Sequence, residues 1–270
     1  MEFINLSSTA STLLITLYSR AAMSRRGMIM EDKKAEEIIS LAGYDEKKLK
    51  VSTKLQALLT LRAHIIDEYT KEFINKHNGE CLIIQLGCGL DSRYIRMNDE
   101  RIKWYDLDFY GTIEMRKRYY KNSTKYKMIS SNVCNFSWLD QIRTFNLPTL
   151  IIGEGLFMYL NEEENKSVIT KLSNTFKNCE FIFDVFSPLS VKFSRFAPSL
   201  RRVNANLKYG YKKSEIMEKM CGIKHLKTHY YYDCNKINDL PLLLRTRFKL
   251  RKVTGIFKKV QRIEIYKNGN

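Results

Sequence analysis

The sequence predicts an α/β fold with an open, doubly wound and mostly parallel sheet. Short apolar segments alternate with segments of helical periodicity along most of the chain, and this alternation is typical of parallel strands joined by crossover helices. The first apolar segment ends in a Gly-x-Gly turn, Gly87 and Gly89, the second ends in Asp108, and a later one ends in Glu154. Because the carboxyl ends of parallel strands meet at one edge of a sheet, these residues are expected to face a common ligand crevice.

The elements are expected in a regular order. Residues 6–43 and 53–77 are expected to be helical, and apolar side chains recur at helical spacing in the second range. The expected strands are 81–86, 102–108, 126–131, 149–154 and 180–186. The expected helices between them lie near 92–97, 110–121, 136–143 and 162–178. Residues 189–211 are basic and irregular, and 213–221 are expected to form another helix.

The glycine turn and the acidic strand end suit a nucleoside cofactor. Neither Gly87 nor Gly89 has a Cβ, so a ligand's polar backbone can approach the main chain closely. A carboxylate at the tip of the next strand can accept hydrogen bonds from both vicinal hydroxyls of a ribose. Asp106 and Asp108 point to the same side of that strand, and Asp108 is favoured because it lies nearer the carboxyl end. With Ser92 at its third small position, the turn matches a dinucleotide fingerprint only imperfectly.

Composition is that of a globular domain. The chain has 270 residues, of which 44% are hydrophobic, enough to bury a full core in one α/β domain. Its six cysteines form no C-x-x-C pair, and several lie in apolar strands, which suggests a reducing compartment. No segment approaches the roughly 18 apolar residues of a membrane span, and the first residues lack the basic region of a secretory signal. A cytoplasmic location is expected.

One spacing resembles a metal site. Cys221, His225, His229 and Cys234 could form a zinc site if His225 and His229 shared a helix face. The tyrosines that follow His229 favour a strand instead, so no metal site is predicted.

The net charge of +17 is unusual for an enzyme that acts on a small molecule. Much of it lies between Arg245 and Arg262, where basic residues alternate with aromatic and aliphatic ones. Such a stripe could follow phosphates or an anionic membrane surface, or it could be a solvated face. A bias toward lysine can extend over a whole proteome, so a dedicated nucleic-acid role is not favoured. The same field would attract an anionic substrate.

Motifs along about two thirds of the chain resemble the leucine carboxyl methyltransferase family, whose bacterial and archaeal branch is described as O-methyltransferases of polyketide biosynthesis. The matching segments are 12–21, 24–26, 61–62, 85–93, 104–108, 114–116, 138–139, 154–160 and 183–188, together with Asp32 and Ala35. The chain departs from the family pattern at Lys33 and Tyr110, where proline is usual, and at Asn132, where an adenine-contacting aspartate is frequent.

The resemblance implies a class I methyltransferase that depends on S-adenosylmethionine. Its fold would be Rossmann-like, with a seven-stranded sheet completed by an antiparallel pair at 223–232 and 260–267. The implied single domain divides into an amino-terminal helical cap, a cofactor-binding core, a substrate-side insertion, and a final helix with strands. These parts are expected at 1–78, 79–187, 188–211 and 212–270.

The resemblance also implies roles for matched positions. The implied cofactor-binding residues are Arg62, Gln85, Gly87, Gly89, Asp108, Asn132, Val133 and Glu154. Arg62 would hold the methionine carboxylate through a bidentate guanidinium, although it could instead be a cation on a helix surface. Asp108 would accept from the ribose hydroxyls, Asn132 and Val133 would flank the adenine, and Glu154 would lie by the cationic half of the cofactor.

Arg20 and Tyr159 are the candidates on the substrate side, although Arg20 could reach the methionine carboxylate and Tyr159 could be a packing residue. A sulfonium methyl is already activated, so transfer needs mainly positioning and desolvation. An ionised carboxylate needs no general base, whereas a phenol or alcohol would benefit from one. The motifs contain no histidine that could act as a base, which favours a carboxylate acceptor or chemistry driven by proximity.

The predicted function is therefore methyl transfer from S-adenosylmethionine to a carboxylate or hydroxyl of a small molecule, which could be polyketide-like. Two alternatives remain at this stage. An NAD-type oxidoreductase would need a proton-relay residue that the sequence does not identify, and a basic RNA-associated protein would bind RNA with a steep salt dependence.

Overall fold

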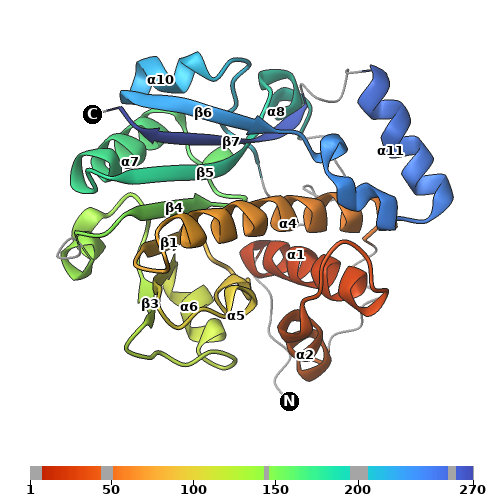
Figure 1. Cartoon of the computed structure of the whole chain (residues 1–270), viewed down its shortest axis with the longest axis horizontal. Helices are drawn as coiled ribbons and strands as arrows, with labels where there is room; N and C mark the ends of the chain where they lie inside the picture. Colours follow the sequence, from red (N-terminus) through yellow and green to blue (C-terminus); the bar gives the residue numbers. More distant parts are fainter. Residues whose placement is uncertain (1–7, 44–50, 143–145, 195–205, 255–259, 270) are drawn as a thin grey trace.

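The computed structural model describes residues 8–43, 51–142, 146–194, 206–254 and 260–269, and within them it confirms the predicted α/β fold (Figure 1). Seven strands form one sheet in the order β3-β2-β1-β4-β5-β7-β6. The strands are β1 (Leu82–Leu86), β2 (Lys103–Asp108), β3 (Tyr126–Ser130), β4 (Thr149–Gly153), β5 (Cys179–Phe186), β6 (Ile223–His229) and β7 (Gln261–Asn268). The first five are parallel, and β7 runs antiparallel to both β5 and β6, as predicted for the final pair.

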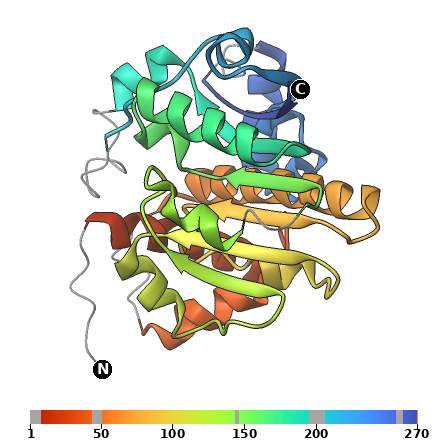
Figure 2. The ribbon, with the colours of Figure 1, turned by 90° about the vertical axis from the view of Figure 1, so that its left-hand side faces the viewer.

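Helices cover both faces of the sheet (Figure 1 and Figure 2). The α-helices are α1 (Ser8–Arg25), α2 (Lys33–Leu41), α4 (Thr53–Lys76), α5 (Arg93–Met97), α6 (Tyr110–Arg116), α7 (Glu162–Thr175), α8 (Pro188–Ser194), α10 (Glu215–Cys221) and α11 (Leu242–Thr254). The 3₁₀ helices are η1 (Phe136–Gln141), η2 (Phe157–Tyr159), η3 (Tyr231–Asp233) and η4 (Asn235–Asp239). One core cluster joins α7, η1 and α10 to one sheet face, and a second joins α1, α2 and α4 to the other.

The central strands explain why the apolar segments are continuous rather than alternating. Every residue of β1 and of β4 is buried, because helices pack on both sides of them. The outer strand β6 is half exposed and has an irregularity in its pairing between His225 and Lys227. The structure therefore places the glycine turn after β1 and Glu154 after β4 at the same sheet edge, next to each other.

The expected helical region 6–43 is not one continuous helix. Gly27 adopts φ +64°, a conformation that side chains with a Cβ rarely adopt, and it ends the first helix. The Asp32 side chain then accepts from the Ala35 backbone N–H at 2.9 Å and caps α2. Apolar residues continue through this break, and for that reason the pattern alone did not locate it.

Other boundaries differ near the carboxyl-terminal end. The strand expected at 223–232 ends at His229, and helix α11 forms where no element was predicted. Phe248 explains this helix, because it is fully buried against Tyr232 while the basic residues of the same stretch face outward. In the range 136–143, where a helix was expected, the structure has the 3₁₀ helix η1 at Phe136–Gln141, and residue 143 lies outside the described residues. In the predicted insertion 188–211, α8 forms the beginning, and 195–205 lie outside the described residues.

In the described part of the chain, no helix has the length and hydrophobicity needed to cross a membrane.

Candidate functional site

A cavity of about 330 Å³ lies at the carboxyl ends of β1 and β4, and α1 and α4 provide its other walls. It brings together most of the predicted site residues, namely Arg20, Arg62, Gln85, Gly87, Gly89, Glu154 and Tyr159. These residues come from four separate parts of the chain, so the fold assembles the site that the strand ends predicted. Asp108, Asn132 and Val133 lie outside the lining of this cavity.

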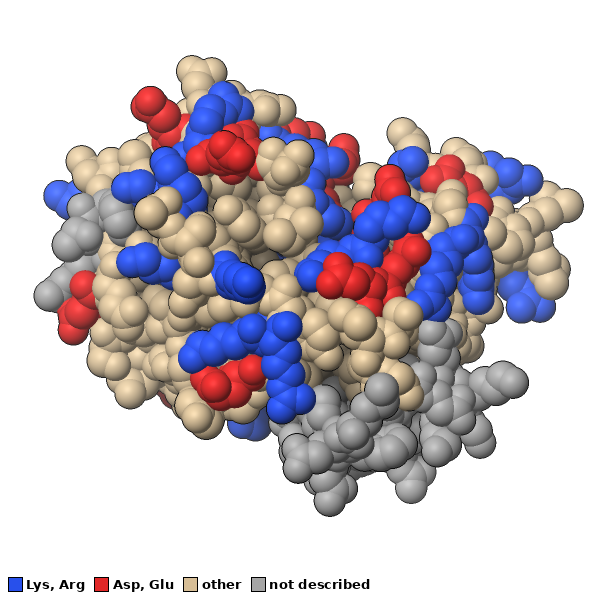
Figure 3. Space-filling view, turned by 90° about the horizontal axis from the view of Figure 1, so that it is seen from below, with Lys and Arg blue, Asp and Glu red and all other residues tan. Residues whose placement is uncertain are grey.

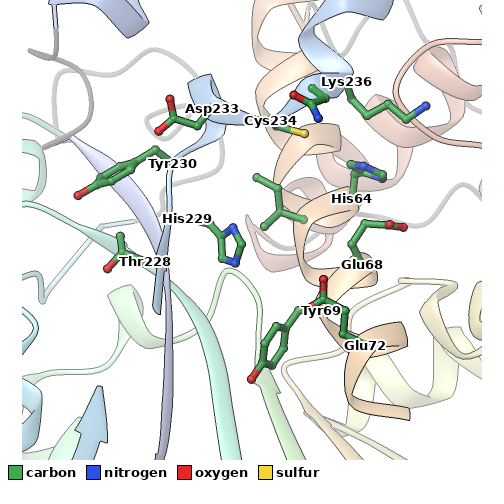
Figure 4. Close-up of a pocket in the computed structure, with 12 residues that line it drawn as sticks. His64, Glu68, Tyr69, Glu72, Thr228, His229, Tyr230, Asp233, Cys234 and Lys236 are labelled. Atoms are coloured by element: carbon green, nitrogen blue, oxygen red, sulfur yellow. The ribbon is translucent and has the colours of Figure 1, made fainter. Parts of the chain in front are cut away.

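A wider groove of about 420 Å³ lies elsewhere, between α4 and the segment from Thr228 to Lys236 (Figure 4). His229 and Cys234, two members of the zinc-like spacing, line this groove. Its described lining residues include no strand end of the parallel sheet and no predicted site residue. Among the described residues, no group of three or more histidine, cysteine, aspartate and glutamate side chains could hold a metal ion. The cavity at β1 and β4 is therefore the candidate site, although it is the smaller of the two.

The glycine turn has the conformation that the sequence predicted. Gly87 and Gly89 adopt φ values of +62° and +54°. A Cβ on Gly89 would lie 2.7 Å from Cδ2 of Leu13 in α1, so the turn and this helix approach closely. The Gly89 N–H donates to Oδ2 of Asp108 at 2.8 Å. This hydrogen bond fixes the carboxylate beside the turn.

The structure separates the roles of the two aspartates of β2. Asp106 is fully buried and accepts from Trp104 Nε1 at 2.8 Å, from the Tyr126 hydroxyl and from Arg116. Asp108 lies at the strand end, where it accepts from the backbone N–H groups of Gly89 and Phe109. Burial raises the pKa of Asp108, and those two donors oppose the rise. Asp106 is thus committed to the core, and Asp108 is the carboxylate at the crevice.

Asn132 and Val133 follow β3 and lie on the same edge of the sheet. The Ser131 N–H donates to the Asp108 carbonyl at 2.9 Å, which connects the two strand ends. Asn132 is exposed, and its side chain accepts from the Cys134 N–H at 3.0 Å. Val133 is buried against the core, and its carbonyl accepts from Trp138 Nε1. These contacts place Asn132 and Val133 next to the end of β2, where Asp108 lies.

Glu154 is held between two arginines. It accepts from Arg62 Nε at 2.9 Å and from Arg93 Nη2 at 2.5 Å. Burial by itself raises the pKa of Glu154, but the two guanidiniums outweigh it and hold that pKa below its usual range. Arg62 also donates from Nη1 to Asp184 at 3.0 Å. Arg62 is buried, so it is not a cation on a helix surface. Its Nε and Nη1 already donate to carboxylates of the chain, and its Nη2 makes no hydrogen bond to a described residue.

Beyond these pairs, buried charges form a continuous network behind the cavity. Arg93 and Arg96 share Asp67 at 2.6 Å each. Arg96 and Arg20 share Asp32 at 2.9 Å each. The whole network contains Arg20, Arg62, Arg93 and Arg96 with Asp32, Asp67, Asp91, Glu154 and Asp184. Four guanidiniums against five carboxylates leave one net negative charge at the cavity.

Two glutamine side chains at the cavity have an amide oxygen that can accept a hydrogen bond from a ligand. Gln85 donates from Nε2 to Asp91 at 2.8 Å, and its Oε1 is buried without a hydrogen-bond partner in the described structure. Gln261 donates from Nε2 to Asp184 at 3.1 Å, and because a carboxylate can only accept, this contact fixes the amide orientation. The Oε1 atom of Gln261 is therefore the part of this amide that can contact a ligand.

Sequence analysis missed Asp67, Arg96, Asp184 and Gln261 as members of the site. Asp184 accepts from the Gly155 N–H at 2.6 Å as well as from Arg62 and Gln261, so it holds three parts of the cavity wall. Its position inside an apolar strand was the available signal, because a charged residue in a buried strand is rare unless it is paired.

The network predicts acid sensitivity. The pKa values of Asp32, Asp91 and Glu154 are lowered. Burial alone would raise them, but the neighbouring arginines and hydrogen-bond donors together outweigh burial. These groups therefore protonate at a lower pH in the folded state than in the unfolded chain. Their stabilisation is complete above the ordinary carboxyl pKa of about 4 and is lost as the pH falls below it. The pKa of Asp108 is raised by burial, so this carboxyl has the opposite effect on the pH dependence, but it is one group against three. We expect the urea midpoint to fall steeply below about pH 4; a flat profile down to about pH 3 would contradict this.

The chain is similar to known methyltransferases. The sequence model of leucine carboxyl methyltransferases matches residues 14–173 of the chain. The tetracenomycin polyketide synthesis O-methyltransferase TcmP of Streptomyces glaucescens is 31% identical over 219 residues, which cover 80% of each protein. The S-adenosyl-L-methionine-dependent methyltransferase dpfgK of Gibberella zeae is 27% identical over 209 residues, or 69% of each protein. A DUF574 family protein of Streptomyces avermitilis superposes with a TM-score of 0.61 at 8% identity, over 95% of this chain and 97% of that one, a likeness of fold alone.

Proposed function

The chain belongs to the leucine carboxyl methyltransferase family and uses S-adenosylmethionine as its cofactor, and from this premise we propose that it methylates an oxygen of a small molecule with an apolar body. Family membership excludes the NAD-type oxidoreductase considered above. The observation that carries the proposal is the cavity itself, which has a charged half beside the glycine turn and an apolar half beyond Glu154.

The charged half fits the cofactor. S-adenosylmethionine carries a sulfonium, an ammonium and a carboxylate, hence one net positive charge, and the network behind the cavity has one net negative charge. The buried, unpartnered Oε1 of Gln85 is an acceptor for an ammonium group. A Cβ on Gly87 would lie 3.2 Å from Leu156 and one on Gly89 would lie 2.7 Å from Leu13, so the two glycines let these side chains pack against the turn. The turn itself lines the cavity, where the amino-acid part would lie beside its backbone. When bound, the cofactor supplies an activated methyl group.

We assign the chain's residues to that cofactor as follows. Arg62 Nη2, with the nearby Arg20, would hold the methionine carboxylate. Glu154 would face the cationic half, and because two arginines keep it ionised, it needs no proton change to do so. Asp108 would accept from the ribose hydroxyls through lone pairs that Gly89 and Phe109 leave unused. The adenine would lie between Asn132 and Val133.

The apolar half is proposed to hold the acceptor. Its walls are the side chains of Leu55, Leu59, Met158, Phe186 and Leu207, with Tyr159 and Gln261 as polar groups. Burial raises the pKa of Tyr159, so its hydroxyl stays protonated at neutral pH. Such walls exclude water and orient an apolar molecule, which are the contributions that methyl transfer requires.

Between the two oxygen acceptors, the site favours a hydroxyl over the carboxylate that the sequence motifs favoured. The Gln261 carbonyl can accept from an O–H group, whereas an ionised carboxylate has no proton to donate and would meet this oxygen unfavourably. The carboxylates of the network also outnumber its arginines, which disfavours a further anion at the cavity.

The direct test supplies methyl-labelled S-adenosylmethionine with a panel of small apolar hydroxy compounds and matched carboxylic acids. Methyl ethers of hydroxyl acceptors survive mild base, whereas methyl esters release labelled methanol. Base-stable product from hydroxy compounds is the expected result. Labelling of carboxylic acids alone would overturn the hydroxyl preference, and labelling at nitrogen or carbon would overturn oxygen transfer.

Replacing Gln261 with leucine provides a prediction for the acceptor side. We expect kcat/KM for a hydroxyl acceptor to fall about tenfold, the worth of one hydrogen bond of about 1.4 kcal/mol, with affinity for S-adenosylhomocysteine unchanged. The control is Lys267→Leu, an exposed position on the same strand. Equal activity of the Gln261→Leu and Lys267→Leu enzymes would remove Gln261 from the acceptor site.

A further inference from the structure

Helix α11 turns an apolar face toward solvent. Leu242, Leu243, Leu250 and Val253 are 70%, 68%, 64% and 83% exposed. The opposite face is fixed to the body by Phe248, which is 1% exposed and packs on the Tyr232 ring. In Figure 1 this helix lies at the outer margin of the molecule, away from the sheet. We call its four exposed apolar side chains the outer face of α11.

The outer face is continuous rather than scattered. Successive residues of an α-helix are separated by about 100°, so these four side chains fall within an arc of about 100°. Phe248 projects more than about 120° away from all of them. The inner side of the helix contributes Phe248 and the partly buried Leu244 to the core, whereas the four aliphatic side chains of the outer face are exposed.

Basic residues border the outer face on both sides. Arg245, Lys249 and Lys252 lie on one side, and Arg247 with Arg251 lies on the other, and the helix contains no acidic residue. Arg247 and Lys249 form no ion pair with a described residue. The view from below shows blue basic side chains next to tan ones at the end of the molecule where α11 lies (Figure 3).

The positive charge extends past the helix onto α4. Burial lowers the pKa of Lys54, and Arg251 and Arg247 lower it further, so this ammonium lies beside the same flank. The chain as a whole carries a net charge of +17. A partner that matches this surface has an apolar region that contacts the outer face and negative charges that contact the basic residues on both sides of it.

We propose that α11 docks on an anionic lipid bilayer, with its outer face at the boundary between headgroups and acyl chains and its basic borders among the headgroups. Aliphatic side chains between rows of arginine and lysine are the composition of helices that lie in a membrane interface. A second copy of the chain does not fit, because the two basic borders would face each other. A nucleic acid would pair with the basic residues but leave the four aliphatic side chains without contacts.

The experiment is cosedimentation of the full chain with phosphatidylcholine vesicles, with and without phosphatidylserine. We expect binding to the anionic vesicles alone, weakening as salt is raised. The triple variant Leu243→Ser, Leu250→Ser, Val253→Ser and the charge variant Arg247→Glu, Lys249→Glu should each lose binding by about tenfold or more. These side chains are exposed, so melting temperatures should match that of the wild type.

Matched controls carry the same changes at other exposed positions. Ile216→Ser with Leu226→Ser, and Lys121→Glu with Lys125→Glu, should bind as the wild type does. Absence of wild-type binding to anionic vesicles overturns the proposal. An equal loss of vesicle binding in the control variants would also overturn the proposal, because it would indicate attraction by the overall charge of the chain. Binding of an acidic amphipathic peptide in place of vesicles would assign the outer face to a protein partner and also overturn it.

Discussion

Replacing Asp106 with alanine is expected to lower the free energy of unfolding by about 3–5 kcal/mol, because it leaves the guanidinium of Arg116 buried without its counter-ion. Both side chains are fully buried. The same carboxylate accepts from Trp104 Nε1 and the Tyr126 hydroxyl, so the change also removes the acceptor of two buried donors. Urea unfolding followed by tryptophan fluorescence measures the effect.

Two further variants make the Asp106 result specific. Glu100→Ala, at an exposed position, should change the unfolding free energy by no more than about 0.5 kcal/mol. Combining Asp106→Leu with Arg116→Met removes both charges together and should recover much of the loss, because neither ion is then left unpaired. An Asp106→Ala protein with the urea midpoint of the wild type would show that this ion pair contributes nothing to stability.

Two residues further along β2, Asp108→Ala is expected to weaken the binding of S-adenosylhomocysteine by about 100-fold. Two hydrogen bonds from ribose hydroxyls to an ionised carboxylate are worth about 1.5–3 kcal/mol each, and water recovers part of this in the variant. The carboxylate is at the strand end rather than in the core, so the unfolding free energy should change much less than in Asp106→Ala. Isothermal titration of both proteins measures the affinities.

Asp108→Asn should give an intermediate affinity, because the amide keeps one acceptor oxygen and loses the charge. If Asp108→Ala binds S-adenosylhomocysteine as tightly as the wild type, the ribose lies elsewhere and the assignment of Asp108 fails. The methyltransferase class would be unaffected by that outcome, because it rests on the family. The neighbouring pair Asp106 and Asp108 thus separates a stability defect from a binding defect within one strand.

The strands and the strand-end residues were predictable from sequence because their signals are local. A buried parallel strand is a short apolar run, and the turn after β1 needs glycine at two positive φ angles. Those two rules place Gly87, Gly89, Asp108 and Glu154 at one edge without knowledge of any long-range contact. The parallel direction of the first five strands followed from the same alternation with helices.

The pairing of buried charges was not predictable, because it depends on which helices approach each other. Arg62 meets Glu154 across 92 residues and Asp184 across 122, and these contacts use the nitrogens that a cofactor carboxylate was expected to occupy. Asp67 meets Arg93 across 26 residues, although nothing in the helical pattern around it indicates a partner. Helix α11 was missed for a related reason, since only Phe248 and the partly buried Leu244 attach it to the core.

The two outer strands of the sheet have a consequence for behaviour at high concentration. β3 and β6 end the strand order, so each has one row of backbone N–H and C=O groups that no strand among the described residues pairs with. Such rows are templates for edge-to-edge aggregation unless lysines or irregular pairing interrupt them. β6 contains Lys224 and Lys227 and loses its regular register between His225 and Lys227, and β3 exposes Lys127. Part of the high lysine content therefore acts as protection against self-association, independently of any ligand.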